Sequence, residues 1–491
     1  MSKSPNLLFI LADQLRAASV PLYGESQIRT PHIDRLAAGG LVLDNMVSTC
    51  PLCTPYRSML LTGRHPQTTG HVINFVTTRY DELSIADAFS HAGYRTGYVG
   101  KWHLHTGSWP PADMVRGEGP FYIPEGRDRL GFDYWRAYNF HWEYFDGWLN
   151  TDGWHTQRWQ GYETDALAQY ATEFLEETDD QKPFCLFVSP HQPHNTLKGM
   201  KFAPERYYDF VPEQPELPAN VPESMRAKVA AEYRHYLAMT LAIDDMVGQL
   251  LDALERVGKA DDTLVVFTSD HGSQFGAHGQ APWNKQQPYR ESMDVPMVMR
   301  LPGVLEGGAR RDVLTAPVDL FPSLCGLCGV PVPQTVEGLD LSDAWRGRAG
   351  AREQDAVPAM NFTQHLCFPG KRDDPGARSN EKVWRAVRTR QHTYVQRLDG
   401  AEELYDLRED PLEQTNRAVD PAFADVRARL ASRLDELLAQ RGDRLDSDVV
   451  YQDWFDHKRR VAANAFGPLP HPEDPPDWSK LAPAGAGTAT S

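Results

Sequence analysis

The sequence predicts an α/β protein with a large, mostly parallel sheet flanked by helices, followed by a smaller C-terminal antiparallel sheet and helix. Two observations lead to this prediction. Three apolar runs, far apart in the chain, each end in aspartate or histidine, as strands do at the carboxyl edge of a parallel sheet. Segments with helical periodicity lie between these runs, and this alternation is typical of such a sheet.

The predicted strands place polar side chains at their carboxyl ends. They are residues 7–12, 183–189 and 263–268, followed by Asp13-Gln14, by Pro-His-Gln-Pro-His194 and by Ser-Asp270-His271-Gly. Because parallel strands end at one edge of their sheet, we expect these groups to meet in one site. A helix over residues 232–257, with one apolar face, is expected to cover the sheet.

The pattern changes at about Lys382 to short alternating strands, at 383–390, 394–397 and 403–407. A helix over 423–440 carries leucines at helical spacing and is expected to pack on these strands. We therefore divide the chain into a main catalytic domain (1–375), a C-terminal α+β subdomain (376–467) and an extended or disordered tail rich in Pro, Ala and Gly (468–491).

Composition excludes some classes of partner. The 491 residues are 41% apolar, which is typical of a folded protein, and 50 basic against 67 acidic residues give a net charge of −17. That charge opposes binding to nucleic acid or to an anionic membrane surface, so an anionic substrate would need a local cluster of cations. The N-terminal apolar run is too short to span a membrane and lacks the features of a signal peptide, and six cysteines do not make a disulfide framework. We expect a cytoplasmic protein.

One short motif carries the strongest functional signal. Cys53-Thr-Pro-Tyr-Arg57, continued by Ser-Met-Leu-Leu-Thr-Gly-Arg64, resembles the signature of the type I sulfatases of the alkaline phosphatase superfamily. In that family a formylglycine-generating enzyme, a partner during maturation, oxidises the cysteine to formylglycine. Further blocks in the family's order extend the resemblance over nearly the whole chain: Asp13-Gln14, Gly100-Lys-Trp-His103, Pro193-His194, Ser269-Asp-His-Gly272 with Lys285, and Glu403-Leu-Tyr-Asp-Leu407 with Asp410-Pro411. The resemblance implies the family's fold and hydrolysis of a sulfate monoester carried by a small molecule or saccharide.

The residue types also suit a divalent metal ion. Asp13, Gln14, Asp270 and His271 offer oxygen donors and one imidazole, and the resemblance implies these four, with residue 53, as the ligands. Ca²⁺ is usual in the family. Many sulfatases, however, have Asp and Asn where this chain has Gln14 and His271, and an imidazole ligand makes Mn²⁺ the alternative.

A hydrated formylglycine is a geminal diol, which explains why the family uses it. One hydroxyl attacks sulfur and displaces the alcohol, and the other collapses to the aldehyde and expels sulfate. The resemblance implies that Arg57 and Lys101 stabilise the charged diol and that His103 takes the proton that triggers elimination. Asp270 would deprotonate the attacking hydroxyl, while His194 and Lys285 would bind sulfate oxygens and protonate the leaving alcohol.

Several alternatives stay open at this point. His191 competes with His194 for the place of the active histidine, although the family's histidine follows a proline, which favours His194. Asn74 is a candidate substrate contact, because the related phosphonate monoester hydrolases use an asparagine at a similar distance from the nucleophile. Those enzymes, acting on phosphonate monoesters or phosphodiesters with the same nucleophile, are the alternative function, but the Lys101-x-His103 pair is typical of sulfatases.

Two other patterns have competing interpretations. Cys50-x-x-Cys53 and Cys325-x-x-Cys328 have zinc-ligand spacing, so a structural zinc site is a hypothesis of a different class. The segment 132–159 is rich in aromatic residues, which either pack as an insertion or line a substrate pocket: Trp135, Tyr138, Trp142, Tyr144, Trp148, Trp154 and Trp159. The sequence does not identify the alcohol that carries the sulfate. It is also compatible with a homo-oligomer.

Overall fold

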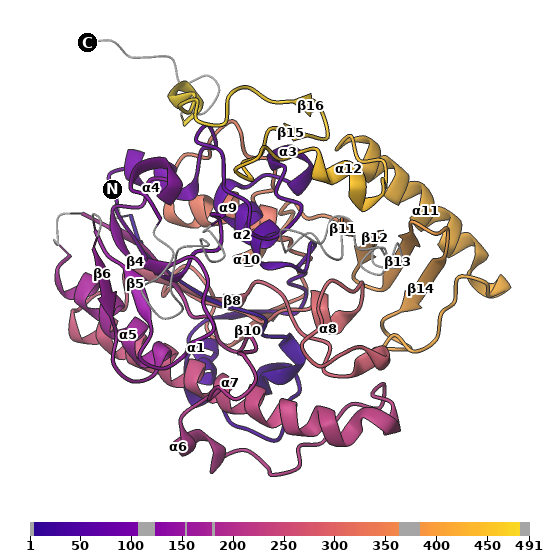
Figure 1. The fold of residues 1–491 in the computed structure, drawn as a ribbon, viewed down its shortest axis with the longest axis horizontal. Coiled ribbons are helices and arrows are strands. Elements are labelled where there is room, and N and C mark those ends of the chain that lie inside the picture. Colours follow the sequence, from indigo (N-terminus) through magenta and orange to yellow (C-terminus); the bar gives the residue numbers. More distant parts are fainter. Residues whose placement is uncertain (1–3, 107–122, 153–154, 179–181, 363–382, 482–491) are drawn as a thin grey trace.

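The computed structural model describes residues 4–106, 123–152, 155–178, 182–362 and 383–481. Its main feature is a ten-stranded sheet (Figure 1). In spatial order the strands are β10 (Ala309–Arg311), β2 (Leu41–Leu43), β9 (Met297–Arg300), β8 (Thr263–Ser269), β1 (Asn6–Ala12), β7 (Phe184–Ser189), β3 (Arg95–Lys101), β4 (Tyr134–Tyr138), β5 (Trp148–Asn150) and β6 (Thr156–Arg158). The five strands from β8 to β4 pair in parallel, which confirms the predicted fold class.

Helices cover both faces of this sheet because its central strands are apolar on both sides. Leu8 and Ile10 of β1 pack with one group of helices, α1 (Pro31–Ala38), α5 (Glu163–Glu176) and α7 (Arg226–Arg256). Leu7 and Phe9 point the other way and pack with α2 (Cys53–Thr62), α4 (Ile85–His91) and α9 (Pro317–Cys328). The sheet therefore lies between two helical layers (Figure 1). Four short helices lie outside these layers: α3 (Pro66–Thr69), α6 (Glu205–Tyr208), α8 (Arg290–Met293) and α10 (Ser342–Trp345).

Helix α2 is the element that matters most for the site. All ten of its residues are buried, so it runs through the interior and not along the surface. It ends at Gly63, which has a φ of +65° and donates its N–H to the carbonyl of Met59 at 2.8 Å. A residue without a side chain suits this left-handed position, and it fixes where the helix stops.

A second, antiparallel sheet follows the main one in the chain. It consists of β11 (Ala356–Asn361), β12 (Trp384–Thr389), β13 (His392–Arg397) and β14 (Glu402–Asp406). Helix α11 (Ala424–Ala439) buries Leu430, Leu434, Leu437 and Leu438 against one face of this sheet. The opposite face packs on the main domain, where Trp384 and Val395 share a core with Met59 of α2.

The last described segment returns to the main domain. Its elements are α12 (Asp448–Gln452), β15 (Ala463–Asn464), β16 (Gly467–Pro468) and a short 3₁₀ helix at Trp478–Leu481. The N–H of Thr77 donates to the carbonyl of Arg459 at 3.1 Å, and the guanidinium of Arg79 donates to the carbonyl of Val461 at 3.0 Å. The loop after the Cys53 helix is thus held by residues from the end of the chain.

These elements do not respect the limits drawn from the sequence. Strand β11 belongs to the second sheet but precedes residue 376, and β16 lies across the limit at 467 and 468. Part of the tail, 482–491, lies outside the described residues.

Two observations bear on other expectations. Within the described ranges, no helix combines the length and the apolar character that a membrane crossing requires. Five cysteines are described, and each is an unpaired, buried thiol: Cys50, Cys53, Cys185, Cys325 and Cys328. Cys367 lies outside the described residues.

Candidate active site

The carboxyl ends of four neighbouring strands bring the predicted site together. Asp13 follows β1, Asp270 follows β8, Lys101 is the last residue of β3, and the segment from His191 follows β7. Because these strands are adjacent in the sheet, residues more than 250 positions apart meet at one edge.

Strand β3 can end beside β7 only because position 100 is a glycine. Gly100 has a φ of +102°, and a Cβ there would lie 2.1 Å from the carbonyl oxygen of Ser189. The glycine lets the two strands approach and turns the chain so that Lys101 and His103 leave the sheet on the site side. His103 also has a positive φ, of +55°.

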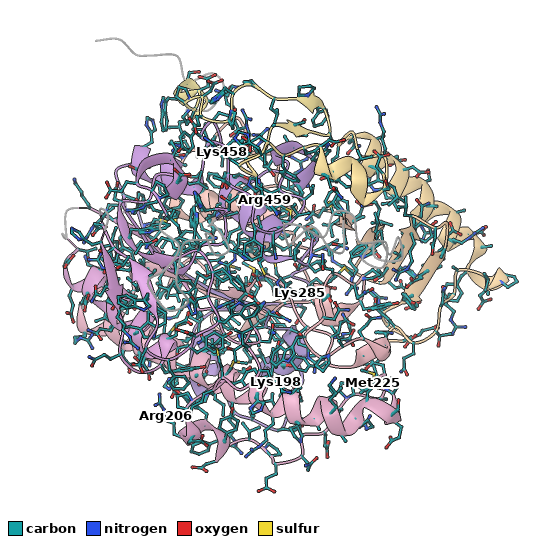
Figure 2. All side chains as sticks on the ribbon, viewed as in Figure 1. Lys198, Arg206, Met225, Lys285, Lys458 and Arg459 are labelled. Atoms are coloured by element: carbon teal, nitrogen blue, oxygen red, sulfur yellow. The ribbon has the colours of Figure 1, made fainter. Side chains whose placement is uncertain are left out.

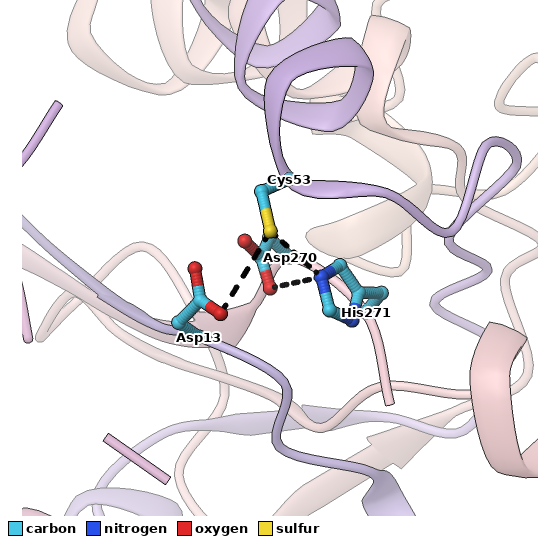
Figure 3. A group of neighbouring side chains, drawn as sticks. All are labelled: Asp13, Cys53, Asp270 and His271. Atoms are coloured by element: carbon cyan, nitrogen blue, oxygen red, sulfur yellow. Dashed lines mark hydrogen bonds and ion pairs between the residues drawn. The ribbon is translucent and has the colours of Figure 1, made fainter. Parts of the chain in front are cut away.

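The side chain of Cys53 lies at the centre of this cluster, at the start of α2 (Figure 3). Its Sγ is 3.2 Å from Nε2 of His271, 3.6 Å from Nζ of Lys285, and 3.9 Å from both Oδ1 of Asp13 and Nζ of Lys101. Burial and the Asp13 carboxylate would raise the pKa of Cys53, but the two lysines and His271 outweigh them and lower it. The site therefore stabilises negative charge on the atom at this position.

The first turn of α2 is fixed by two contacts from other loops. The N–H of Thr54 donates to Oδ1 of Asn74 at 2.9 Å, and Oγ1 of Thr54 donates to the carbonyl of His103 at 2.7 Å. Asn74 thus caps the helix that carries Cys53. The structure gives it this positioning task, and its contact with substrate stays a prediction.

Arg57 lies one turn further along α2 and is fully buried. Its Nη2 donates to Oδ2 of Asp13 at 2.9 Å and to Oδ2 of Asp270 at 3.3 Å. Its Nη1 donates to Oγ of Ser189 and to the carbonyl of Lys101, each at 2.8 Å. Arg57 therefore ties the ends of four strands together, and its direct partners are the two carboxylates and not Cys53.

The predicted metal ligands converge. One donor atom from each of Asp13, Cys53, Asp270 and His271 lies within 4.8 Å of the others, and all four residues are buried. Burial and the neighbouring Asp13 raise the pKa of Asp270, so two adjacent carboxylates disfavour each other's charge here. A divalent cation between them would remove that repulsion, and the mixed oxygen and nitrogen donors fit such an ion.

Gln14 is placed beside this group. Its backbone N–H donates to Oδ1 of Asp270 at 2.9 Å, and its side-chain Oε1 accepts from Nζ of Lys285 at 3.1 Å. Lys285 thus contacts both Gln14 and Cys53, and Figure 2 shows it near the middle of the molecule.

His103 is buried with neither ring nitrogen hydrogen-bonded to any described residue. Burial, Lys101 and Arg57 lower its pKa, so the ring is neutral and able to accept a proton. Its ring packs against Phe75 and Phe140, with ring centroids 4.8 and 5.0 Å away. The side chain is thus held by apolar contacts and keeps its nitrogens for the site.

His194 and His191 both reach the site. One nitrogen of each lies in a group with a carboxylate oxygen of Asp13, all within 4.8 Å of one another. His194 uses Nδ1 for a 2.9 Å hydrogen bond to the carbonyl of Asn195, whereas both nitrogens of His191 lack a partner among the described residues. The sequence left a choice between these histidines, and the structure places both together.

The aromatic segment divides between core and site. Trp135 packs with Trp102 in the core, 5.1 Å between ring centroids. Trp142 packs edge-on against Phe140 at 4.8 Å and lies 5.9 Å from His194. Trp154 lies outside the described residues.

Phe140 is the member of this segment that the sequence analysis missed. It lies two residues after β4, contacts His103, His191 and His194, and has Nζ of Lys101 over its ring at 4.8 Å. Its position directly after a strand was the available signal.

The cysteines do not form the alternative zinc site. Of the described groups of His, Cys, Asp and Glu that could hold a metal, one includes Cys53, and none includes Cys50, Cys325 or Cys328. Cys325 and Cys328 are buried in the core of α9, as small apolar residues are.

Comparisons with known proteins agree on one family. Residues 5–330 match the model of the family described as Sulfatase, and residues 276–440 match the model described as N-sulphoglucosamine sulphohydrolase, C-terminal. The chain is 34% identical to the Ulvan-active sulfatase of Formosa agariphila over 91% of this chain and 83% of that protein. It is 26% identical to the N-acetylglucosamine-6-O-sulfatase of Bacteroides thetaiotaomicron over 94% of this chain and 91% of that protein. The phosphonate monoester hydrolase of Agrobacterium radiobacter shares the fold, with a TM-score of 0.70 at 24% identity over 89% of this chain and 96% of that one.

Proposed function

Because the chain belongs to the sulfatase family, we propose that it hydrolyses a sulfate monoester of a saccharide, with a formylglycine made from Cys53 as the nucleophile. The products are the free hydroxyl and inorganic sulfate. The observation that carries this proposal is the position of Cys53 Sγ, which lies within 4 Å of two lysine ammonium groups and of His271. This is the local positive cluster that an anionic substrate needs in a protein of net charge −17.

A divalent cation completes the proposed site. Ca²⁺, with Mn²⁺ as the alternative, would be held by Asp13, Gln14, Asp270, His271 and the modified residue 53. When bound, it supplies positive charge that polarises a sulfate oxygen and favours the ionised nucleophile. Arg57 holds the two carboxylates in place at 2.9 and 3.3 Å, and this keeps the ligand set rigid.

The surrounding side chains have separate tasks in the proposed reaction. Lys101 and Lys285 stabilise negative charge at residue 53, since their ammonium groups flank it on two sides. Neutral His103 accepts the proton whose removal lets sulfate leave. His194 and Lys285 bind the sulfate oxygens and protonate the departing hydroxyl.

A saccharide is the proposed carrier of the sulfate. Support comes from the relatives, of which one is named an Ulvan-active sulfatase and another an N-acetylglucosamine-6-O-sulfatase. Phe75, Phe140 and Trp142 add apolar faces beside His103 and His194, and aromatic faces pack well on sugar rings.

The test combines modification with turnover. The protein is co-expressed with a formylglycine-generating enzyme, and the peptide containing residue 53 is analysed by mass spectrometry. Turnover is measured on 4-nitrophenyl sulfate, on sulfated saccharides and on a phosphonate monoester. We expect the mass of formylglycine at position 53 and sulfate hydrolysis that falls by at least about 10⁴-fold in Cys53→Ala.

Cys50→Ala is the matched control, because Cys50 is also a buried thiol close to the motif but packs in a hydrophobic cluster. It should leave the modification and the turnover unchanged. Active protein with an unmodified Cys53 would overturn the proposed nucleophile. Preference for the phosphonate ester over every sulfate ester would replace the proposed function by the phosphonate hydrolase.

Cytoplasmic location and homo-oligomer formation stay predictions. Fractionation of cells with an antibody to the protein measures the first, and analytical ultracentrifugation measures the second.

A further inference from the structure

His191 is the buried polar side chain at the site that the proposed function does not use. Its exposed fraction is 0%, and neither ring nitrogen has a hydrogen-bond partner among the described residues. In that part of the chain, the other buried imidazole with both nitrogens unpartnered is His103, which borders Cys53. Since an unsatisfied buried nitrogen costs free energy, both rings call for a ligand.

His71 shows what a buried histidine with a packing task looks like in this fold. It is also 0% exposed, but its Nδ1 and Nε2 lie 3.1 Å from the hydroxyls of Ser58 and Thr78 respectively. The chain thus supplies partners where an imidazole is only part of the core. It supplies none to His191.

The ring of His191 is nevertheless held firmly. Its backbone N–H donates to Oε1 of the buried Glu163 at 3.1 Å. Its ring centroid lies 4.8 Å from that of Phe140, 5.7 Å from Tyr144 and 5.4 Å from His141. Fixed packing with free nitrogens is the arrangement expected of a side chain kept in position for a ligand.

His191 and His194 differ in what they can donate. The rings lie 4.8 Å apart, nearly parallel, on the same side of Asp13. The carbonyl of Asn195 can only accept a hydrogen bond, so Nδ1 of His194 carries a proton, and in the neutral ring Nε2 can only accept. No such bond fixes the tautomer of His191, so its neutral ring can donate an N–H.

The charge around the pair favours an anionic ligand. Asp13, His191 and His194 could in principle hold a metal ion. However, the ammonium of Lys101 lies 2.6 Å from Oδ2 of Asp13, and the same ammonium lies over the ring of Phe140, which touches both histidines. A second dication there would meet this charge, whereas a sulfate oxygen would be attracted by it.

We propose that His191 is a substrate-contacting residue, whose imidazole N–H donates to an oxygen of the bound sulfate ester beside His194. This inference rests on the proposed function and extends it. Residue 191 then gives the site a donor that needs no added proton, next to a histidine whose free nitrogen donates only when the ring is charged.

The test measures binding separately from turnover. In a Cys53→Ala background, which cannot form the nucleophile, the dissociation constant of 4-nitrophenyl sulfate is measured by calorimetry with the metal present. His191→Phe should raise this constant by about 10- to 100-fold, the effect of losing one hydrogen bond to a charged group. His191→Asn, which keeps an N–H donor, should lose less. In the formylglycine-containing enzyme, kcat/KM should fall in the same order.

Thermal unfolding separates a contact with substrate from a structural role. Since His191→Phe fills the space and removes two unpartnered nitrogens, its unfolding midpoint should stay the same or rise. His71→Phe, the matched control, should lower the midpoint and leave the dissociation constant unchanged.

Three outcomes would overturn the inference. An unchanged dissociation constant with a lowered midpoint in His191→Phe would make the residue structural. Two metal ions per chain in wild type, with one in His191→Phe, would make it a ligand of a second metal. Both results leave the proposed function intact as long as wild type hydrolyses sulfate esters, and a wild type without that activity would overturn both proposals.

Discussion

Two fully buried arginine–aspartate pairs stand on either side of the boundary between the main sheet and the second sheet, and they are built differently. In the first, Nη2 of Arg57 donates to Oδ2 of Asp13 at 2.9 Å. In the second, Nε of Arg385 donates to Oδ2 of Asp443 at 2.7 Å. The side chains of both pairs are at most 1% exposed.

The second pair is complete. The remaining nitrogens of Arg385 donate to the hydroxyl of Tyr451 at 2.7 Å and to the carbonyls of Asn361 and Trp384 at 3.1 and 3.0 Å. Asp443 also accepts from Nε2 of Gln67 at 2.6 Å. Such a pair joins the two sheets and has no polar atom to offer a ligand.

The first pair is deliberately incomplete in its surroundings. Asp13 is shared between Arg57, Lys101 and the Cys53 thiol, while Nε of Arg57 and both nitrogens of His103 and His191 have no partner among the described residues. The comparison teaches that burial and ion pairing alone do not mark a functional site. Donors and acceptors left over after pairing do.

The largest expected effect is on folding and comes from breaking the complete pair. Arg385→Met leaves Asp443 buried without its cation and should lower the free energy of unfolding by about 3 to 5 kcal/mol. Urea unfolding checks this. The kcat of the folded, modified enzyme should stay within about twofold of wild type. Arg429→Met, on the exposed face of α11, is the control, and a large fall in kcat for Arg385→Met would contradict the division of roles.

The next effect is on turnover and comes from the incomplete cluster. Lys101→Met leaves Asp13 paired with Arg57 but removes an ammonium 3.9 Å from the residue-53 side chain. We expect kcat to fall by about 10²- to 10³-fold, as for one lost electrostatic contact to the transition state, with little change in the unfolding midpoint. The exposed Lys182→Met should change neither quantity. Equal loss of stability in Lys101→Met and Arg385→Met would erase the contrast.

A smaller effect concerns the dependence of stability on pH at the junction of the two sheets. Burial raises the pKa of Glu413 from 4.5 to about 7, although Arg388 opposes the shift. Because the folded-state pKa is raised, the stabilisation from its proton is fully present below about pH 4.5 and is lost as pH rises through about 7. The free energy of unfolding should therefore fall over that range, by about 2 to 3 kcal/mol from this group.

Glu413→Gln, which is neutral at every pH, should flatten that slope. Urea unfolding at pH 5, 6, 7 and 8 measures it. Glu409→Gln, at an exposed position four residues earlier, should keep the wild-type slope. Parallel slopes in all three proteins would show that Glu413 keeps its charge over this range.

The smallest expected effect tests how the site's main helix is held. Asn74→Ala removes the acceptor for the N–H of Thr54 and should cost about 1 kcal/mol of unfolding free energy, the usual value for a lost helix cap. Asn74→Asp keeps an acceptor oxygen and should retain the stability. If kcat falls in Ala but recovers in Asp, Asn74 acts by positioning Cys53; if it falls equally in both, the amide itself is needed.

The fold could be predicted best where physical constraints were strongest. The strands expected at 7–12, 183–189 and 263–268 occur at Asn6–Ala12, Phe184–Ser189 and Thr263–Ser269, because strands buried on both faces must be apolar throughout. Strand β11 was missed. It contains Pro358, which argues against a strand, but β11 is an edge strand, where a proline is tolerated.

The candidate site shows the same limit. Motifs pointed to Asp13, Cys53, Lys101, Asp270, His271 and Lys285, and the structure brings these residues together. The roles assigned to them stay predictions. The places of His191 and Phe140 depend on neighbours from other strands, and spacing along the chain carries no record of those neighbours.

The return of the chain's last segment to the loop after α2 has a consequence for synthesis. Thr77 and Arg79 are bonded to the carbonyls of Arg459 and Val461, which are made about 400 residues after Cys53. At about 5 to 20 residues per second, a ribosome needs about 20 to 80 s to reach them. During that interval the Cys53 segment lacks its final neighbours and stays open to an enzyme that would be excluded from the finished protein, where Cys53 is 0% exposed. The timetable of translation, and not a motion of the folded protein, then sets when Cys53 can be modified.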